Sequence, residues 1–421
     1  MERFALSRMK EWKENENRKP LIIRGARQVG KTWIMKTFGQ QYFEKTAYVN
    51  FDNNARMKQV FEGDLDIERL VLSISAETGV SIEAENTLII FDEVQEVPKA
   101  LTSLKYFYEN APQYAIVAAG SLLGLHQGTS FPVGKVDFLD LYPLNFREFL
   151  CAMGEKQFVS MLDSCDTQMV TVFKTKYIER LREYYFVGGM PEVVKDFSEK
   201  KDYNRVRAIQ KNLINYYQQD FSKHAEIKLV PRLNLVWNSI PMQLAKENKK
   251  YIYGQVREGS RAKDFELAIQ WLLDCGLIHK VQRIQKPDLP LKAYIDFDAF
   301  KLFLVDIGLL IAMTDLDAKV IIEGNKIFTE FKGALTEQYI LQQLISDVGV
   351  IPYYYSTQNS KGEIDFLVQG KTSVIPIEVK AEENLKAKSL KAFCEKYQPS
   401  YAVRTSMSDY REQDWMTNIH L

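Results

Sequence analysis

The chain has 421 residues, of which 46% are hydrophobic, and its 55 basic side chains balance 55 acidic ones. This length predicts two to four domains, and the balanced charge excludes a bulk positive field that would draw the whole molecule to nucleic acid or an anionic membrane. The four cysteines and four histidines are scattered, so neither a disulfide framework nor a zinc site is predicted. We find no signal peptide and no apolar run of membrane-spanning length, and we therefore expect a cytoplasmic protein with no membrane partner.

The first predicted elements surround a glycine-rich segment. An apolar run at residues 21–23 leads into eight residues that fit the pattern G-x-x-x-x-G-K-S/T at every defined position: Gly25, Ala26, Arg27, Gln28, Val29, Gly30, Lys31 and Thr32. Between a strand and a helix, such a segment turns backbone N–H groups and a helix N-terminus toward phosphate oxygens. We expect these residues to bind ATP, with Lys31 at the β and γ phosphates and Thr32 as a ligand of Mg²⁺. A plain glycine turn is the alternative.

Two adjacent carboxylates follow a later strand. After a strand at residues 46–51, an apolar run at residues 87–91 ends in Asp92 and Glu93. We expect Asp92 to hold Mg²⁺ through water and Glu93 to act as the general base on the attacking water. A solvated acidic turn at a strand end is the alternative. The position of the two carboxylates downstream of the glycine-rich segment at residues 25–32, a P-loop, argues against it.

A hydroxyl ends the next strand along the chain. The apolar run 115–119 is followed by Ser121, which we predict to sense the γ-phosphate at the carboxyl edge of the sheet. The extra strand between the P-loop and the acidic pair favours an AAA-like ATPase over a nucleotide kinase. Arg147 is a candidate arginine finger, and a surface salt bridge is the alternative for this residue.

The middle of the chain contains a helical segment and a basic cluster. Helical spacing from residue 157 to about 223 is broken at Gly188 and Gly189, which predict either a fixed hinge or packing corner against the ATPase sheet or a plain loop. From residue 229 to about 320 we predict a winged-helix-like domain, with a two-stranded wing at 277–281 and 299–305. Contact with DNA and a solvated basic face are both open for its basic residues, which are Lys246, Lys249, Lys250, Arg257, Arg261 and Lys263.

The last hundred residues predict a helix (331–345), three strands (351–355, 363–368 and 374–379), a helix (386–397) and a strand (401–403). Asp365 lies on the second strand, and Glu378 and Lys380 share one face of the third because side chains two apart point the same way. We expect Asp365 and Glu378 to bind Mg²⁺ with Lys380 orienting or deprotonating a water, and Glu337 on the first helix to add a ligand. Ordinary charges at a strand edge are the alternative.

This order of elements, with Asp365 and the Glu378-Val379-Lys380 tripeptide, resembles the PD-(D/E)xK nuclease superfamily over residues 321–421. The P-loop, the acidic pair, the segment 143–149, the Gly188 to Pro191 turn and the segment 301–309 together resemble the prokaryotic AAA-type ATPases that carry a DUF4143 C-terminal region. The resemblance covers nearly the whole chain. It implies an ATP-binding core followed by a winged-helix-like segment and a nuclease-like tail.

We therefore expect an α/β protein with four domains: a P-loop AAA-like ATPase domain with a parallel sheet (1–155), a helical segment (156–228), a winged-helix-like domain (229–320) and a nuclease-like α/β domain (321–421). One hypothesis is an Mg²⁺-dependent ATPase that couples nucleotide state to the tail and acts on or near DNA. The second is an ATP-dependent conformational switch that binds a protein partner, with an inactive nuclease-like docking domain. Self-association stays open, since AAA-like relatives often form rings.

Overall fold

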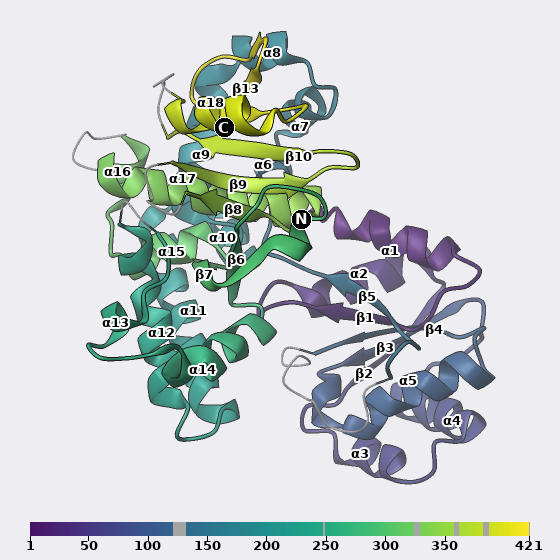
Figure 1. Cartoon of the computed structure of the whole chain (residues 1–421). Helices are drawn as coiled ribbons and strands as arrows, with labels where there is room; N and C mark the ends of the chain where they lie inside the picture. Colours follow the sequence, from purple (N-terminus) through teal and green to yellow (C-terminus); the bar gives the residue numbers. More distant parts are fainter. Residues whose placement is uncertain (121–131, 247–248, 324–328, 358–361, 382–386, 421) are drawn as a thin grey trace. The chain divides into compact units, whose positions relative to one another are not determined.

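The computed structural model describes residues 1–120, 132–246, 249–323, 329–357, 362–381 and 387–420, which form two compact units. The N-terminal unit consists of residues 2–142 together with 274–276. The C-terminal unit consists of residues 143–273 and 277–421 together with Met1. In Figure 1 the N-terminal unit is coloured purple and blue, and the C-terminal unit runs from teal to yellow.

The N-terminal unit is built on a five-stranded sheet in which every pair of neighbouring strands is parallel. Its strands in spatial order are β2 (Lys45–Asn50), β3 (Thr87–Asp92), β4 (Ala115–Ala119), β1 (Leu21–Arg24) and β5 (Asp137–Asp140). Its helices are α1 (Ala5–Glu14), α2 (Lys31–Tyr42), α3 (Ala55–Glu62), α4 (Ile67–Thr78) and α5 (Pro98–Asn110). Figure 1 shows α1 and α2 on one face of the sheet and α3, α4 and α5 on the other.

The core of this sheet is apolar on both faces. All residues of β3 and β4 are buried, as expected for parallel strands that are covered by helices on both sides. On one face, the rings of Phe51, Phe61 and Phe91 meet edge to face with centroids 5.4 to 5.6 Å apart. This packing fixes the carboxyl ends of the strands. Because β4 lies between β1 and β3, the P-loop after β1 and the carboxylates after β3 meet at one edge, two strands apart.

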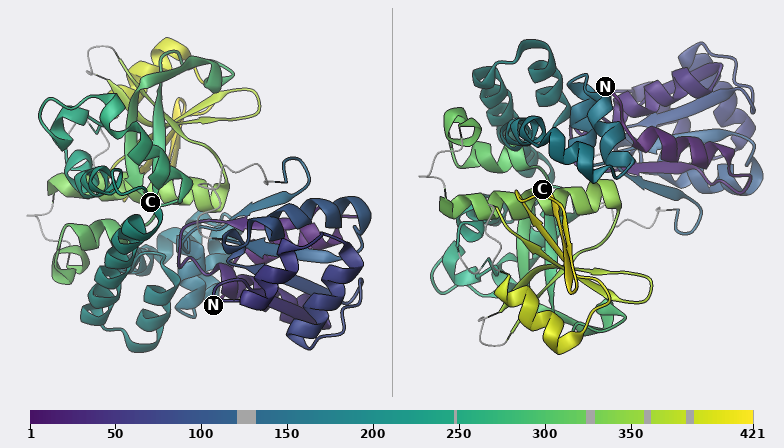
Figure 2. Two further views of the ribbon diagram at one scale, coloured as in Figure 1. Left: turned by 90° about the horizontal axis from the view of Figure 1, so that it is seen from below. Right: turned by 90° about the horizontal axis from the view of Figure 1, so that it is seen from above.

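The C-terminal unit combines many helices with an eight-stranded mixed sheet. Its helices are α6 (Phe146–Ala152), α7 (Lys156–Asp163), α8 (Thr167–Val172), α9 (Lys174–Val187), α10 (Pro191–Lys200), α11 (Tyr203–His224), α12 (Val230–Leu244), α13 (Tyr253–Val256), α14 (Ala262–Asp274), α15 (Ile307–Met313), α16 (Ala318–Ile322), α17 (Thr329–Gln343) and α18 (Lys388–Tyr397). Its strands in spatial order are β12 (Arg411–Gln413), β13 (Met416–His420), β11 (Val403–Ser406), β10 (Val374–Val379), β9 (Glu363–Gln369), β8 (Tyr353–Ser356), β6 (Ile278–Ile284) and β7 (Ile295–Leu304). One π-helical turn, Leu344–Val348, follows α17. Figure 2 shows this unit from two further directions, and α18 packs against β9 and β10.

The predicted α/β class and the parallel sheet are confirmed, and so is the order of the tail elements from α17 through β8, β9, β10 and α18 to β11. The two expected wing strands do pair with each other in antiparallel fashion as β6 and β7. However, β6 also pairs in parallel with β8, so the pair extends the sheet of the tail. The hairpin of β12 and β13 was not predicted. No helix in the described part of the chain combines the length and apolarity needed to cross a bilayer.

Candidate functional site

The predicted P-loop lies between β1 and α2 at the carboxyl edge of the parallel sheet. Gly25 has a φ of +143°, and a Cβ there would lie 2.1 Å from the carbonyl oxygen of Leu141. Gly30, the residue before α2, is left-handed with a φ of +93°. Side chains are therefore strained or excluded at both positions, as a backbone that curls around phosphate requires. This accounts for both glycines of the motif.

Lys31 folds back over the loop. Its Nζ donates hydrogen bonds to the carbonyl oxygens of Gly25, at 2.9 Å, and Ala26, at 2.7 Å. Burial lowers the pKa of Lys31 to about 8, although the charges of Glu93 and Asp92 oppose this shift. The buried ammonium of Lys31, held against the P-loop backbone, is well placed to meet phosphate oxygens, which would replace the two carbonyl acceptors.

The carboxylate of Asp92, at the end of β3, is hydrogen-bonded to side chains from α2 and β2. Its Oδ2 accepts hydrogen bonds from the hydroxyl of Thr32 at 2.7 Å and from the hydroxyl of Tyr48 at 2.9 Å. Its Oδ1 accepts from the backbone N–H of Glu93 at 3.0 Å. A hydroxyl and a carboxylate in contact beside a phosphate-binding loop fit Mg²⁺, which prefers oxygen ligands and keeps several waters. Thr32 and Asp92 are thus the residues that would hold this ion.

Glu93 occupies a strained position. It is left-handed, with a φ of 52°, and it interrupts the chain between β3 and a short 3-10 turn. Its Oε2 accepts a hydrogen bond from the Nε2 of Gln95 at 2.5 Å. The charges of Glu93 and Asp92 both act on Lys31, so the carboxylate of Glu93 lies near the P-loop lysine. This is the location that a general base would need.

The sequence did not identify two residues of this site, Tyr48 and Gln95. Tyr48 lies on β2, whose pairing with β3 brings Asn50 opposite Asp92. The only available signal was its position two residues before the end of a strand next to the motif strand. Ser121, the predicted γ-phosphate sensor, lies outside the described residues. Arg147, the candidate finger, is ion-paired in the C-terminal unit with Asp163 and, at 3.0 Å, with Asp347.

The Gly188 and Gly189 turn is a packing corner built around a buried carboxylate. The Oδ2 of Asp306 accepts a hydrogen bond from the N–H of Gly189 at 2.6 Å, and its Oδ1 accepts from the N–H of Leu309 at 3.0 Å. A Cβ at Gly189 would lie 2.1 Å from the carbonyl oxygen of Leu144, and one at Gly188 would lie 2.3 Å from Asp306. Three separate sequence segments therefore meet within the C-terminal unit at this corner.

The tail carboxylates are already neutralised by lysines. Glu337 on α17 is ion-paired with Lys249 and, at 3.5 Å, with Lys301, which also pairs with Glu363. Burial and the neighbouring Glu337 raise the pKa of Asp365. Burial would also raise the pKa of Glu337, but Lys249 and Lys301 outweigh it and lower that pKa. The ammonium of the fully buried Lys301 therefore lies between the carboxylates of Glu337 and Glu363.

Glu378 and Lys380 pair with each other instead of converging on the other carboxylates. Their side chains are 2.8 Å apart, and Glu378 is buried. The N–H of Val379 donates to the Oδ2 of Asp365 at 2.7 Å, so Asp365 lies beside the end of β10. Yet no three His, Cys, Asp or Glu side chains in the described ranges form a group with metal-binding geometry. The residues of the tail, as arranged here, do not fit Mg²⁺.

Three regions of the chain match known protein families. Residues 17–150 match an AAA domain, residues 178–320 a domain of unknown function, DUF8612, and residues 332–421 a domain of unknown function, DUF4143. We found no match among curated proteins.

Several solved structures are similar to this chain. A Walker-type ATPase of Pyrococcus abyssi is 15% identical, over 74% of this chain and 95% of that chain, with a TM-score of 0.46. The Orc1 protein of Aeropyrum pernix in complex with DNA is 12% identical, over 80% and 93%, with a TM-score of 0.26. The RuvB Holliday junction branch migration motor of Thermotoga maritima is 9% identical, over 65% and 87%, with a TM-score of 0.30. All three TM-scores are below 0.5, and we base no argument on them. By its family matches, the chain combines an AAA domain in its N-terminal part with a DUF4143 region in its C-terminal part.

Proposed function

We propose that the N-terminal unit binds ATP with Mg²⁺ and hydrolyses it. The observation that carries this proposal is the contact between Thr32 and Asp92, 2.7 Å apart, beside the P-loop lysine. Thr32 lies in the first turn of α2 and Asp92 at the end of β3, and together they supply the oxygen ligands that Mg²⁺ takes in P-loop ATPases. When bound, the ion would offset negative charge on the phosphate oxygens.

Each residue of the site then has a defined task. The P-loop backbone holds the phosphates, and Lys31 exchanges its two carbonyl acceptors for phosphate oxygens. Glu93 orients the attacking water and accepts its proton. The hydrogen bond from Gln95 either positions the carboxylate for this task or breaks before the proton is transferred. Tyr48 holds Asp92 in place from the neighbouring strand.

Equilibrium binding of a fluorescent ATP analogue tests the first step. Removal of a charge-assisted contact costs about tenfold or more in affinity, so we expect Lys31→Ala to bind at least that much more weakly than wild type. Lys58→Ala, a lysine on α3, is the matched control and should bind as wild type does. Equal affinities for all three proteins would rule out the P-loop as the nucleotide site.

For the tail, the geometry favours the switch hypothesis over a nuclease. Of the three carboxylates that a metal-dependent nuclease would use, Glu337 and Glu378 are ion-paired with lysines, and Asp365 accepts a hydrogen bond from a backbone N–H. Lys249 also belongs to the basic cluster that was a candidate for DNA contact, and its ammonium group is ion-paired with Glu337. We therefore propose that the tail is a docking domain for a protein partner. We also propose that the nucleotide state controls how far this domain is exposed.

Incubation with labelled single-stranded, duplex and branched DNA in Mg²⁺ or Mn²⁺ tests this second proposal. We expect no cleavage by the wild-type chain. Cleavage that is lost in Asp365→Ala would contradict the docking interpretation and restore the nuclease hypothesis, whereas cleavage that survives this substitution comes from a contaminant. Stimulation of ATP turnover by DNA would likewise favour DNA over a protein as the partner.

A further inference from the structure

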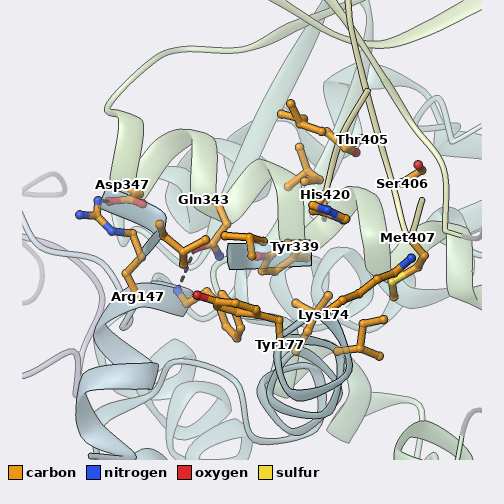
Figure 3. Close-up of a pocket in the computed structure, with 17 residues that line it drawn as sticks. Arg147, Lys174, Tyr177, Tyr339, Gln343, Asp347, Thr405, Ser406, Met407 and His420 are labelled. Carbon is orange, nitrogen blue, oxygen red and sulfur yellow. Dashed lines mark hydrogen bonds and ion pairs between the residues drawn. The ribbon is translucent and has the colours of Figure 1, made fainter. Parts of the chain in front are cut away.

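A cavity in the C-terminal unit lies between the helical segment and the last strands of the tail. Its volume is about 270 Å³, and it is lined by residues of α6 to α9, α17, the π-helical turn, β11 and β13 (Figure 3). Its lining residues are up to 274 residues apart in sequence, since Phe146 and His420 both line it. None of the groups proposed for ATP binding contributes to this cavity.

The walls of the cavity are mostly apolar and partly aromatic. Phe146, Tyr177 and Tyr339 supply rings, and Figure 3 shows Tyr177 and Tyr339 facing the same space. The hydroxyl of Tyr177 is already bonded to the carbonyl oxygen of Phe158 at 2.8 Å, so this ring presents its apolar surface. Pockets of this size and composition typically hold small molecules with planar apolar parts.

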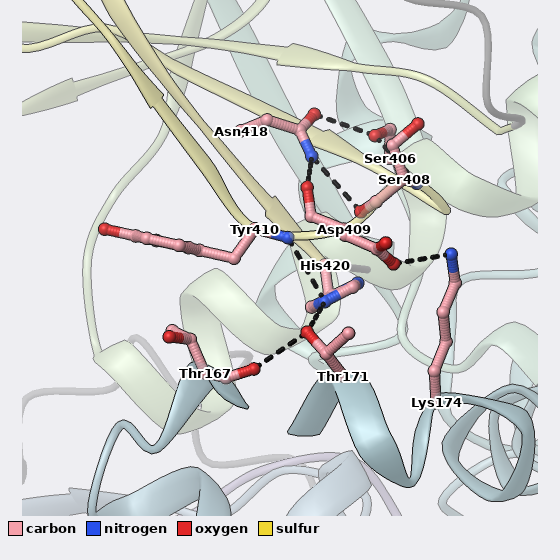
Figure 4. A network of polar contacts seen from close by, with 9 residues as sticks. All are labelled: Thr167, Thr171, Lys174, Ser406, Ser408, Asp409, Tyr410, Asn418 and His420. Atoms are coloured by element: carbon pink, nitrogen blue, oxygen red, sulfur yellow. Dashed lines mark hydrogen bonds and ion pairs between the residues drawn. The ribbon is translucent and has the colours of Figure 1, made fainter. Parts of the chain in front are cut away.

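The charged groups of the lining are already paired, which removes the need for a charged ligand. At one end Arg147 pairs with Asp347, and at the other Lys174 pairs with Asp409 at 2.8 Å (Figure 4). Burial lowers the pKa of His420, although the charge of Asp409 opposes this shift. Its Nε2 is held within a network that includes the N–H of Tyr410 at 3.3 Å.

Two polar groups of the lining lack a hydrogen-bond partner among the described residues, the Nε2 of Gln343 and the hydroxyl of Thr405. The hydroxyl of Thr405, on β11, is buried, since the residue is only 3% exposed, and it makes no hydrogen bond with any described residue. Buried hydroxyl groups nearly always have a partner, and one that does not is a site where a ligand or a water completes the set. The cavity also borders the π-helical turn at Asp347, a distortion that is frequent at functional sites.

We propose that this cavity binds a small, uncharged aromatic molecule with one polar substituent, whose substituent pairs with the hydroxyl of Thr405 and whose ring packs among Phe146, Tyr177 and Tyr339. The site lies beyond the proposed ATPase function and does not depend on it. Because the ligand contacts both the helices α7 to α9 and the strands β11 and β13, its binding also stabilises their association.

Isothermal titration calorimetry with 2-naphthol tests the proposal, with naphthalene as the analogue that lacks a hydroxyl group. Wild type should bind 2-naphthol at one site, and the volume-matched Thr405→Val should bind it about tenfold more weakly because one hydrogen bond is lost. Naphthalene should bind wild type and Thr405→Val equally. Charged 2-naphthoate should bind at least about tenfold more weakly than 2-naphthol, because Arg147 and Lys174 in the lining are already ion-paired.

A blocking variant provides the second arm. Leu162→Trp fills the cavity from α7 and should abolish binding, whereas Val172→Trp, on the exposed side of α8, should bind as wild type does. Circular dichroism checks that each variant is folded, and Thr405→Val decides the matter if Leu162→Trp is not. Absence of 2-naphthol binding to wild type, or equal binding by wild type and Thr405→Val, would overturn the proposal.

Discussion

At the scale of single residues, the contact between Tyr48 and Asp92 can be tested apart from ATP turnover. Tyr48→Phe removes one of the two hydroxyl donors to the Oδ2 of a nearly buried carboxylate. We expect the free energy of unfolding to fall by about 1 kcal/mol, which is typical for one hydrogen bond, with the fold retained. Urea titration of the variant measures it, and Tyr106→Phe on α5 is the control. Equal stabilities of Tyr48→Phe and Tyr106→Phe would show that the hydrogen bond contributes nothing.

Asp306 gives the molecule a predictable pH dependence. Burial raises the pKa of this carboxyl to about 6 in the folded state, against an ordinary value of 3.8. The folded state therefore binds more protons than the unfolded state between about pH 4 and 6, and the free energy of unfolding falls as pH rises through this window. The shift corresponds to about 3 kcal/mol.

Urea unfolding of wild type and Asp306→Asn across pH 4 to 7 isolates this contribution, because other groups titrate alike in both proteins. We expect the free energy of unfolding of wild type, minus that of Asp306→Asn, to fall as pH rises. The reason is that only wild type has a carboxyl group that loses its proton in this range. A difference that stays constant with pH would mean that Asp306 does not titrate in this range.

The sequence predicted those residues of the ATP site that are close in sequence and missed those that depend on pairing. Lys31 and Thr32, like Asp92 and Glu93, belong to short motifs whose spacing sets their geometry. Tyr48 reaches Asp92 only because β2 is the neighbour of β3, which no local pattern specifies. Similarly, Asp306 meets Gly189 across 117 residues of chain.

At the scale of elements, the Gly188 and Gly189 turn should not tolerate side chains. Gly189→Ala would force the loop away from Leu144 and break the hydrogen bond between the N–H of Gly189 and Asp306. We expect a loss of about 2 to 4 kcal/mol in the free energy of unfolding, measured by urea titration. Gly333→Ala, inside α17 with open space around it, is the control and should stabilise by up to about 1 kcal/mol. Similar small effects of both substitutions would show that close packing at the Gly188 and Gly189 turn does not stabilise the fold.

Helices and strands of the tail could be predicted because their hydrophobic periodicity is local. The pairing of β6 with β8 could not, because it depends on which edge of the hairpin is buried against the tail. The short strands β12 and β13 carry little apolar alternation, and their hairpin depends on contacts such as the hydrogen bonds between Asn418 and the carbonyl oxygens of Ser408 and Asp409. The hydrophobic pattern within one segment does not predict such contacts between segments.

At the scale of the whole molecule, Lys301 joins the middle of the chain to the tail. It lies on β7, is fully buried, and pairs with Glu337 on α17 and Glu363 on β9. Lys301→Met leaves Glu363 without this counter-ion and leaves Glu337 with Lys249 alone, and we expect a loss of about 3 to 5 kcal/mol from the free energy of unfolding.

The double variant Lys301→Met/Glu363→Gln is the matched control for this prediction. It removes the carboxylate charge that Lys301→Met leaves without its partner and should recover part of the lost stability in the same urea titration. If the double variant is no more stable than Lys301→Met, the ion pairs do not account for the joint between β7 and the tail.

The most direct test of the central claim is phosphate release from ATP by wild type and Glu93→Gln at saturating MgATP. The amide keeps the shape of the side chain but cannot accept a proton. We predict a turnover rate at least about a hundredfold lower than that of wild type, as is typical for loss of a general base, with ATP affinity unchanged. An unchanged turnover rate in Glu93→Gln would contradict the assignment of this edge of the sheet as the site of ATP hydrolysis.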